Sequence, residues 1–495
     1  MATISLQEIA QHDKKDDLWV ILYGKVYDLT QFLPEHPGGQ KIILKFAGKD
    51  ATKAFERQHP PSIIDQYLSP DVCIGQAEVN NEEEELQEEE TEEDKRVKLA
   101  REKMPRLEEM YNTFDFESVA KNILKADAWG YFNSGANDEI SMRENHNAFH
   151  RIWLRPRVMV DVANIDMTTK MLGDKTSFPL YISATALNKM AHPDGEKTLA
   201  VAAGNQGVIQ MIPTLASYSI DDIVGARIHP DQPQWFQLYV HKDRSIAKRM
   251  VEHAESKGIK GLFITVDTAT LGRREKDMRQ KYVHEGPAEL QGEELNREGG
   301  VATASSGIID MTLNWKDIAW FKSITKLPIV LKGIQTWEDA VLAARYGCAG
   351  IVISNHGGRQ LDFAPSPIEI LPEVMDALKR EGLENSLEVY IDGGIRRGSD
   401  IFKAIALGAK GVGIGRPTLY AMAGYGFKGV EKLLQLYQDE LEMCMRLMGA
   451  RTIADIKPEM VDTRNLKDHF VANPTDYLAK NAYEKMVPRG NISKL

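Results

Sequence analysis

Residues 349–362, AGIVISNHGGRQLD, join a short apolar run to a loop that carries an imidazole, two glycines and a guanidinium. The apolar run is typical of a buried strand. A strand that opens onto His356 and Arg359 would fix both side chains while the loop supplies chemistry. A surface loop with an incidental histidine would give the same pattern, so the remainder of the chain has to decide. We interpret the stretch as one strand-and-loop unit of an enzyme.

Further apolar, β-rich runs alternate with helical patterns through the large C-terminal part of the chain. Such alternation is typical of parallel βα units. Regular recurrence over about 250 residues and the lack of an early GxGxxG favour an α/β fold of the (β/α)8 TIM-barrel type over a doubly wound sheet. The predicted strands are 179–183, 208–212, 235–239, 261–266, 328–331, 350–353, 388–391 and 411–414.

The composition of the chain breaks sharply at residues 80–95, where glutamates crowd a stretch without apolar periodicity. Like-charge repulsion favours a solvated linker, helical at its end, over a core element. The break therefore separates a small α+β domain from the barrel. The predicted boundaries are a small domain at 1–80, an acidic linker at 81–103, the barrel at 104–486 and a tail at 487–495.

Two short strands flank Gly24 in the small domain, at 19–22 and 25–28. His36 then precedes a Pro-Gly-Gly turn that lets the backbone pass close to a flat ligand, and His59 follows beyond an amphipathic helix. Two histidines on separate helical hairpins suit six-coordinate haem iron. Spacing alone leaves a purely structural role open for both.

Polar side chains and glycines follow the predicted barrel strands, at the rim where barrel active sites form. Each has an ordinary structural explanation by itself, but their convergence on one rim favours a functional site. Glycines and arginines follow the last two strands, the usual phosphate site of such barrels, and indicate a phosphorylated cofactor. Metal-ligand spacing and nucleophile motifs are missing from this set, so hydrolysis is poorly supported. The residues are Thr185, Ala186, Gln237, Tyr239, Thr265, Asp267, Lys332, His356, Arg359, Asp392, Gly393, Gly394, Arg396, Gly413, Gly415 and Arg416.

Charge and targeting signals narrow the partners and the compartment. A formal net charge of -11 argues against nucleic acid as a partner. Three scattered cysteines fit a reducing compartment, and no apolar run approaches the roughly 20 residues of a membrane span. The final residues Ser493, Lys494 and Leu495 spell a peroxisomal import signal. We therefore expect a peroxisomal protein, with the mitochondrial intermembrane space or the cytoplasm as alternatives.

The first 80 residues resemble the cytochrome b5-like haem domain. The resemblance rests on HPGG at residues 36–39 together with the second histidine, His59. It implies haem b with His36 and His59 as iron ligands. Because both axial positions are then filled, the resemblance implies a carrier of single electrons and not an oxygen binder.

The barrel resembles the FMN-dependent L-2-hydroxy acid dehydrogenase and oxidase family over residues 116–484. With the haem domain in front, the chain resembles the flavocytochrome b2 family of L-lactate:cytochrome c oxidoreductases. That resemblance implies FMN, a small L-2-hydroxy acid substrate, cytochrome c or a similar protein as acceptor, and a homotetramer. An oxidase that reduces oxygen to hydrogen peroxide is the alternative. The matching motifs are YFNSGANDE from Tyr131, RPRVMVDV from Arg155, SATAL from Ser183, FQLYV from Phe236, TVDTATLGRRE from Thr265, IVLKG from Ile329, SNHGGRQLD from Ser354 and DGGIRRG from Asp392.

The same resemblance implies a role for the residues that would face the substrate. Arg359, with Tyr131 and Arg274, would clamp the substrate carboxylate. Tyr239 would hydrogen-bond the substrate hydroxyl. His356 would be the base, and Asp267 would orient its ring and stabilise the imidazolium. Ala186 and Leu215 would line a small apolar pocket that suits a methyl group, and so lactate.

The cofactor contacts are implied in the same way. Lys332 would place a positive charge near the pyrimidine side of the flavin, where reduction deposits negative charge. Pro213 stands where the yeast lactate enzyme of this family has a hydroxyl residue, which leaves one flavin contact in doubt. Residues 281–306 form a long polar stretch that is expected to be a lid or a disordered loop. The other implied FMN contacts are Thr185, Ala186, Gln237, Thr265, Ser354, Asp392, Gly393, Gly394, Arg396, Gly415 and Arg416.

Overall fold

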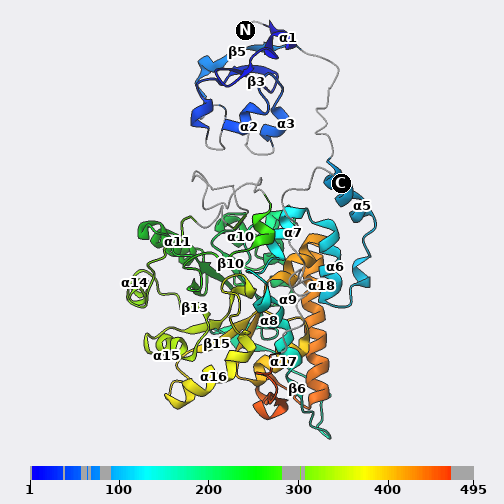
Figure 1. Ribbon diagram of the computed structural model, residues 1–495, viewed down its shortest axis with the longest axis vertical. Helices are drawn as coiled ribbons and strands as arrows, with labels where there is room; N and C mark the ends of the chain where they lie inside the picture. The colour runs from blue at the N-terminus through cyan, green and yellow to red at the C-terminus, as the bar shows by residue number, and fades with distance from the viewer. Residues whose placement is uncertain are drawn as a thin grey trace, which may run out of the picture. The chain divides into compact units, whose positions relative to one another are not determined.

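The computed structural model of the protein describes residues 3–36, 40–56, 64, 68–78, 91–280, 301–302 and 307–469 (Figure 1). Contacts divide these residues into two compact units, one ending at Lys95 and the other beginning at Arg96. The helix α5 (Glu92–Glu102) forms at the end of the acidic stretch. Arg96 donates to the carbonyls of Asn122 and Leu124 at 2.6 and 2.8 Å. The last part of the predicted linker 81–103 therefore belongs to the barrel unit, whereas residues 79–90 lie outside the described residues.

The first unit is built on a five-stranded sheet with the order β1-β5-β4-β3-β2. The predicted hairpin is present, because β3 pairs antiparallel with β4 around Tyr23 and Gly24. Both turn residues have positive φ, 53° and 73°, which suits the twist of a two-residue hairpin. The elements are β1 (Thr3–Ile4), α1 (Leu6–Ile9), β2 (Asp13–Lys14), β3 (Asp17–Leu22), β4 (Lys25–Asp28), η1 (Leu33–Glu35), α2 (Gln40–Leu44), α3 (Thr52–Glu56), η2 (Pro70–Val72) and β5 (Cys73–Ala77).

Alternation along β3 gives the first unit two apolar clusters. Leu18, Val20 and Leu22 pack with Leu33 in one cluster, and Ile21 packs in the other. Successive side chains of a strand point to opposite faces, so one strand supplies both. The first cluster also takes residues from the helical segments that follow His36, including Ile43 and Leu44. The segment that begins with His36 is thus packed on the sheet by its own apolar residues.

The second unit is a closed barrel of eight parallel strands, which confirms the predicted fold class (Figure 1). The predicted strands agree with the observed ones to within three residues at each end. The largest difference is β13, which continues past Leu331 through an irregularity in its pairing with β14. The strands are β9 (Leu180–Ile182), β10 (Ile209–Pro213), β11 (Gln234–Leu238), β12 (Leu262–Thr265), β13 (Ile329–Ile334), β14 (Gly350–Ile353), β15 (Glu388–Asp392) and β16 (Gly411–Ile414).

Helices alternate with these strands along the chain and cover the barrel from outside. Leu180 and Ile182 pack outward against the helices, whereas Tyr181 between them points inward. The helices that follow the strands are α9 (Gly195–Gln206), α10 (Ile220–Gly225), α11 (Arg244–Ser256), α12 (Glu275–Met278), α14 (Asp317–Ile324), α15 (Trp337–Arg345), α16 (Pro367–Arg380), α17 (Gly398–Ala406) and α18 (Arg416–Met448). The elements before the barrel are α6 (Thr113–Ile123), α7 (Ala126–Phe132), α8 (Ile140–His150) and the short strands β6 (Trp153–Leu154), β7 (Thr169–Met171) and β8 (Asp174–Thr176). The short strand β17 (Val461–Asp462), which follows α18, pairs antiparallel with β6.

The barrel interior is filled by one layer of large side chains, so it is a packed core and not a channel. Two side chains of this layer come from β10 and one from each of the other strands except β16, and Trp235 packs on Phe263 with ring centroids 4.6 Å apart. Among the described residues no helix is long and apolar enough to cross a bilayer. The layer consists of Tyr181, Ile209, Met211, Trp235, Phe263, Val330, Val352 and Tyr390.

Candidate active site

The next inward-facing positions along the strands are mostly polar. A strand repeats its facing every two residues, so the positions two beyond the aromatic layer also point into the barrel. This step leads from Tyr181 to Ser183 and from Trp235 to Gln237. Backbone geometry therefore gathers the candidate residues on a rigid floor at the carboxyl ends of the strands. The positions are Ser183, Pro213, Gln237, Thr265, Lys332, Ser354 and Asp392.

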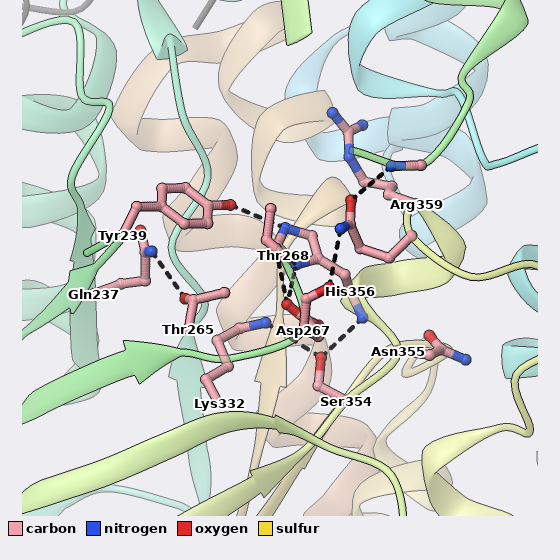
Figure 2. Close-up of polar contacts among 12 residues, drawn as sticks. Gln237, Tyr239, Thr265, Asp267, Thr268, Lys332, Ser354, Asn355, His356 and Arg359 are labelled. Carbon is pink, nitrogen blue, oxygen red and sulfur yellow. Dashed lines mark hydrogen bonds and ion pairs between the residues drawn. The ribbon is translucent and has the colours of Figure 1, made fainter. Parts of the chain in front are cut away.

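His356 lies above this floor and is bonded on both ring nitrogens (Figure 2). Its Nδ1 is 3.0 Å from Oδ1 of Asp267, and its Nε2 is 3.2 Å from the hydroxyl of Tyr239. A proton on Nδ1, donated to the carboxylate, leaves Nε2 as a hydrogen-bond acceptor that faces the Tyr239 hydroxyl. Thr268 Oγ1 donates to the same Asp267 oxygen at 3.0 Å. The arrangement is that of an oriented general base.

The charges around this pair favour a neutral imidazole beside an ionised carboxylate. Burial lowers the pKa of His356 from 6.5, and Asp267 opposes that shift. For Asp267, burial by itself would raise the pKa, but His356 and Lys332 hold it below its ordinary value. Burial, with Asp267 nearby, raises the pKa of Tyr239 to about 12, so its hydroxyl keeps its proton at neutral pH. At neutral pH His356 is therefore ready to accept a proton.

Lys332 and Ser354, which Figure 2 shows beside His356, form a buried polar group with Asp392. Lys332 Nζ donates to Ser354 Oγ at 3.2 Å and lies 3.3 Å from Oδ2 of Asp392. Burial disfavours the ammonium, but Asp392 and Asp267 raise the pKa of Lys332 above its usual value. Ser354 Oγ accepts from the backbone N–H of His356 at 3.0 Å. The group keeps Lys332 protonated at the floor, beside the carboxylate of Asp392, and also holds the His356 backbone.

A second set of cations stands at the side of the cavity. Arg359 lies over the ring of Tyr131, 4.8 Å from its centroid, and donates to the Tyr131 carbonyl at 2.6 Å. Arg274 donates through Nε to the carbonyl of Arg359 at 3.1 Å. Burial, together with the like charge of Arg359, lowers the pKa of Arg274 to about 9, which still leaves it protonated at neutral pH. Two neighbouring guanidinium groups of this kind suit a carboxylate ligand.

The amide of Gln237 is fixed from both ends. Its Nε2 donates to Thr265 Oγ1 at 2.9 Å, and its Oε1 accepts from the backbone N–H of Thr214 at 3.2 Å. Pro213 comes directly before Thr214 in the chain and offers no hydrogen-bond donor. It lines the cavity, so the position where the sequence departs from the yeast enzyme lies in the cavity wall. Thr214 Oγ1 donates to the Gln237 carbonyl at 2.7 Å, so this hydroxyl links the end of β10 to β11.

A cavity of about 420 Å³ opens at this rim and brings the predicted residues together. Its wall includes Tyr131, Tyr239, Arg274, Lys332, His356 and Arg359 from the predicted catalytic and substrate set. From the predicted cofactor set Thr265 and Ser354 do not line it, and they contact residues that do. The other predicted lining residues present are Thr185, Ala186, Pro213, Leu215, Gln237, Asp392, Gly393, Gly394, Arg396, Gly415 and Arg416.

The cavity wall fits a phosphorylated flavin. Ser183 Oγ is buried there without a hydrogen-bond partner among the described residues, and so offers a contact to a polar ring. Gly394 has φ of 83°, and a Cβ there would lie 1.9 Å from the Asn145 carbonyl, so only glycine allows this close approach. Arg396 borders the same region and forms an ion pair with Glu117 at 2.6 Å. Lys332, Gln237 and Ser183 could hold the ring, and Arg396 the phosphate.

Arg416 has a structural role that its position in the sequence did not indicate. Its guanidinium donates to the carbonyls of Phe132, Ser134 and Gly357 at 2.9, 2.8 and 2.9 Å. These carbonyls lie beside Tyr131 on one segment and His356 on the other. The side chain thus joins two loops of the cavity, and the phosphate contact predicted for Arg416 stays a prediction.

Of the two predicted haem ligands, His36 lies among the described residues and His59 does not. His36 ends η1 and stands near Phe32, with ring centroids 5.9 Å apart. His59 and the Pro-Gly-Gly turn lie outside the described residues, as does most of the predicted lid 281–306 and the final Ser493, Lys494 and Leu495. The structure therefore places one predicted iron ligand in the first unit, beside that unit's larger apolar cluster.

Several supporting residues were missed by reasoning from the sequence. Thr268 follows Asp267 directly, and Gln360 follows Arg359, yet neither received a role. Asn145 and Asn355 exchange two amide hydrogen bonds, at 2.8 and 2.6 Å, between α8 and the His356 loop. Only the neighbours of a charged motif residue could have been suspected from sequence, because contacts between residues far apart along the chain leave no periodic signal.

Comparison with known proteins gives two family matches. The FMN-dependent dehydrogenase family matches residues 120–463, and the cytochrome b5-like heme/steroid binding domain matches residues 5–78. The L-lactate dehydrogenase (cytochrome) of Wickerhamomyces anomalus is 52% identical over 97% of this chain and 83% of its own length. The Saccharomyces cerevisiae protein of the same name is 47% identical, with the same coverage.

Solved structures lead to the same group. The flavin-binding domain of baker's yeast flavocytochrome b2 superposes with a TM-score of 0.72, at 47% identity, over 81% of this chain and 98% of that domain. The chain thus belongs to the FMN-dependent dehydrogenase family, in the group whose barrel is preceded by a cytochrome b5-like haem domain.

Proposed function

We propose that the protein oxidises L-lactate, or a similar small L-2-hydroxy acid, to the 2-oxo acid and passes the electrons singly to an acceptor through its haem domain. The observation that carries the proposal is the ring of His356, which Asp267 orients from outside the cavity wall and which lines one cavity together with Arg359. Relatives named L-lactate dehydrogenase (cytochrome), which match 97% of this chain, support it. FMN, when bound, supplies a two-electron acceptor that can release electrons one at a time.

The chain's own residues would bind the substrate and take its proton. Arg359 and Arg274 would hold the carboxylate, and the hydroxyl of Tyr239 would meet the substrate oxygen. His356 Nε2 would accept a proton from the substrate, while Nδ1 keeps its own proton and donates it in a hydrogen bond to Asp267. The buried carboxylate then stabilises the imidazolium, and Lys332 favours negative charge at the cavity floor.

Substrate size follows from the apolar part of the wall. Ala186 and Leu215 line the cavity, and Leu215 is almost fully buried. A small residue and a medium one leave room for a methyl group, which fits lactate better than a long-chain acid. Apolar contacts discriminate by about 1 to 3 kcal/mol per methylene, so activity on a four-carbon acid should fall and not vanish.

Stopped-flow absorbance with L-lactate tests the proposal by following the flavin and haem bands together. Bleaching of the flavin followed by reduction of the haem is expected. His59→Ala should abolish the six-coordinate haem spectrum and leave flavin reduction in place, because only haem iron needs that ligand. A flavin that stays oxidised with saturating L-lactate would refute the proposal.

The acceptor is proposed to be a one-electron carrier such as cytochrome c. An oxidase that makes hydrogen peroxide is the second candidate, and the terminal SKL is the observation that favours it. Peroxide yield and cytochrome c reduction, measured side by side on one preparation, separate the two. Peroxide formed in proportion to lactate consumed would select the oxidase.

We also propose that the protein is imported into peroxisomes, as its last three residues suggest. A fluorescent protein fused to the N-terminus should then give punctate signal, and deletion of Ser493, Lys494 and Leu495 should make it diffuse. Mitochondrial signal from the intact fusion would contradict this address.

A homotetramer is proposed from the family resemblance. Exposed apolar side chains in the barrel unit support association between copies, among them Val158 and Met159 on the segment after β6 and Leu447 near the end of α18. Light scattering on the purified protein should give about four times the chain mass, and a monomer would reject the proposal.

A further inference from the structure

Gln360 uses every hydrogen-bonding position of its side-chain amide. Its Nε2 donates to the carbonyls of Asp267 and Thr270 at 3.0 and 2.8 Å. Its Oε1 accepts from Arg274 at 3.1 Å and from the backbone N–H of Gly272 at 3.3 Å. Two carbonyls on one side and two donors on the other fix which end is oxygen and which is nitrogen. The side chain therefore holds one defined orientation.

This amide connects the two halves of the candidate chemistry. Asp267, whose carbonyl it binds, orients the base His356 (Figure 2). Arg274, whose guanidinium it binds, lines the cavity beside Arg359. Gln360 itself does not line the cavity. It can thus act on the reaction only through these neighbours.

Among the residues that the structure describes, Arg274 donates hydrogen bonds only to neutral oxygens, although the charge of Asp277 acts on it through space. Its hydrogen bonds go to the Arg359 carbonyl and to the Gln360 amide oxygen, and no carboxylate forms an ion pair with it there. Arg396 and Lys332, at other parts of the same cavity, are instead paired with Glu117 and Asp392. A neutral partner fixes the direction of a guanidinium without cancelling its charge, whereas a carboxylate would do both.

We propose that Gln360 is a positioning residue for substrate binding, which orients Arg274 through a neutral amide and so keeps its positive charge available to the carboxylate of the 2-hydroxy acid. The inference rests on the proposed function, because it assigns the use of Arg274 to an anionic substrate. It explains why an amide, and not the nearly isosteric carboxylate, occupies this position. Removal of the amide should misdirect Arg274, and a carboxylate in its place should neutralise it.

Two substitutions separate orientation from charge. Gln360→Met removes the hydrogen bonds and adds no charge, so it should raise the dissociation constant for L-lactate by about threefold to tenfold. Gln360→Glu keeps the shape, adds a charge beside Arg274 and replaces the donor that faces the Asp267 and Thr270 carbonyls by an acceptor, so it should raise that constant by at least about tenfold beyond the Met variant. Both constants come from the lactate dependence of the flavin-reduction rate in stopped flow, and the limiting rate should change less than the dissociation constant.

Gln232→Glu is the matched control. Gln232 is also buried, and its amide binds the Ala200 carbonyl and the Ile228 backbone N–H without an arginine partner. Its substitution should change lactate binding by less than about twofold, because no substrate-facing cation depends on it. Thermal unfolding and FMN content of all variants show how far each has lost structure.

A double-mutant cycle then identifies Arg274 as the residue through which Gln360 acts. In an Arg274→Met background, Gln360→Glu should weaken lactate binding by less than about twofold. The same full loss in both backgrounds would overturn the inference, as would equal effects of Gln360→Met and Gln360→Glu. Loss of folding in both Gln360 variants, with Gln232→Glu intact, would also overturn it, because the role would then be structural. A wild-type protein whose flavin is not reduced by L-lactate would refute the proposed function instead.

Discussion

At His356, burial and a buried carboxylate act on the imidazole in opposite directions. Burial lowers the pKa of the ring, and Asp267 raises it again without restoring 6.5. A base must be neutral to accept a proton, so activity that depends on His356 is present above its pKa and is lost below it. The acid limb of the pH profile is therefore expected below 6.5.

His356→Gln should retain FMN and lose flavin reduction by roughly four orders of magnitude. The substitution removes the proton acceptor and the cation that forms on it, while the residues proposed to hold the cofactor stay in place. The lactate-driven bleaching rate in stopped flow measures the effect. Near-normal reduction in this variant would exclude His356 from the chemistry.

Asp267→Asn should lower the plateau rate by roughly 100-fold or more and move the acid limb to lower pH. The carboxylate raises the pKa of His356, so its loss lets burial lower that pKa further. The rate falls because the imidazolium loses its counter-charge. Flavin reduction measured between pH 4.5 and 8 gives both quantities, and a limb that moves upward would contradict the assignment.

At the scale of single residues, the sequence predicted the charged side chains of the site but not the neutral side chains that hold them in position. His356, Asp267, Arg359 and Lys332 stand in motifs whose side chains already imply chemistry, and the structure brings all four to one rim. Gln360 is adjacent to Arg359 in the chain, but its contacts depend on the path of the loop after β12. A neutral amide gives no charge pattern, so its role had to come from hydrogen-bond geometry.

Among the elements, the loop after β14 shows how glycines place the catalytic side chains. Gly358 has φ of 75°, and a Cβ there would lie 2.5 Å from the backbone of Met142 on α8. Asn355 also ties this loop to α8 through Asn145. The helix and the loop that carries His356 therefore pack backbone to backbone, which only glycine allows.

Gly358→Ala is expected to displace the His356 loop and to lower kcat/KM for L-lactate at least roughly tenfold, with a clear loss of stability. Gly382→Ala is the matched control, because Gly382 also has positive φ, 67°, but none of the residues that the structure describes lies within 4 Å of its missing Cβ. It should cost about 1 kcal/mol of stability and leave kcat/KM unchanged. Thermal unfolding and steady-state kinetics on both variants test the contrast, and equal kinetic losses would show that backbone strain, not packing, is responsible.

Element boundaries were predictable for the strands and less so for the connections. Strands buried on both sides appear as continuous apolar runs, so β14 and β16 have the predicted bounds. The extension of β13 through Gly333 was missed, because φ of 114° there depends on how closely Asp267 packs against it. The use of Arg416 as a link between two loops was missed for the same reason, since the carbonyls that it binds come from distant segments.

At the scale of the whole molecule, the proposed redox groups are divided between two units. Every residue proposed to act on lactate lies in the unit that begins at Arg96, and His36 lies in the other. Composition alone predicted two domains with an acidic segment between them, because a run of glutamates cannot enter a core. The boundaries at 80 and 103 stay predictions.

Deletion of residues 83–90 tests whether the acidic segment serves electron transfer between the units. A tether sets the effective concentration of one unit for the other, so a changed length should slow haem reduction. Flavin reduction by L-lactate should stay nearly constant, because the cavity residues all belong to the barrel unit. Stopped-flow traces of the flavin and haem bands separate the two phases. The idea is falsified if both phases slow equally. It also fails if the deletion leaves the rate of haem reduction unchanged and the two units, supplied as separate chains at micromolar concentration, reduce the haem as fast, since tethering would then add nothing.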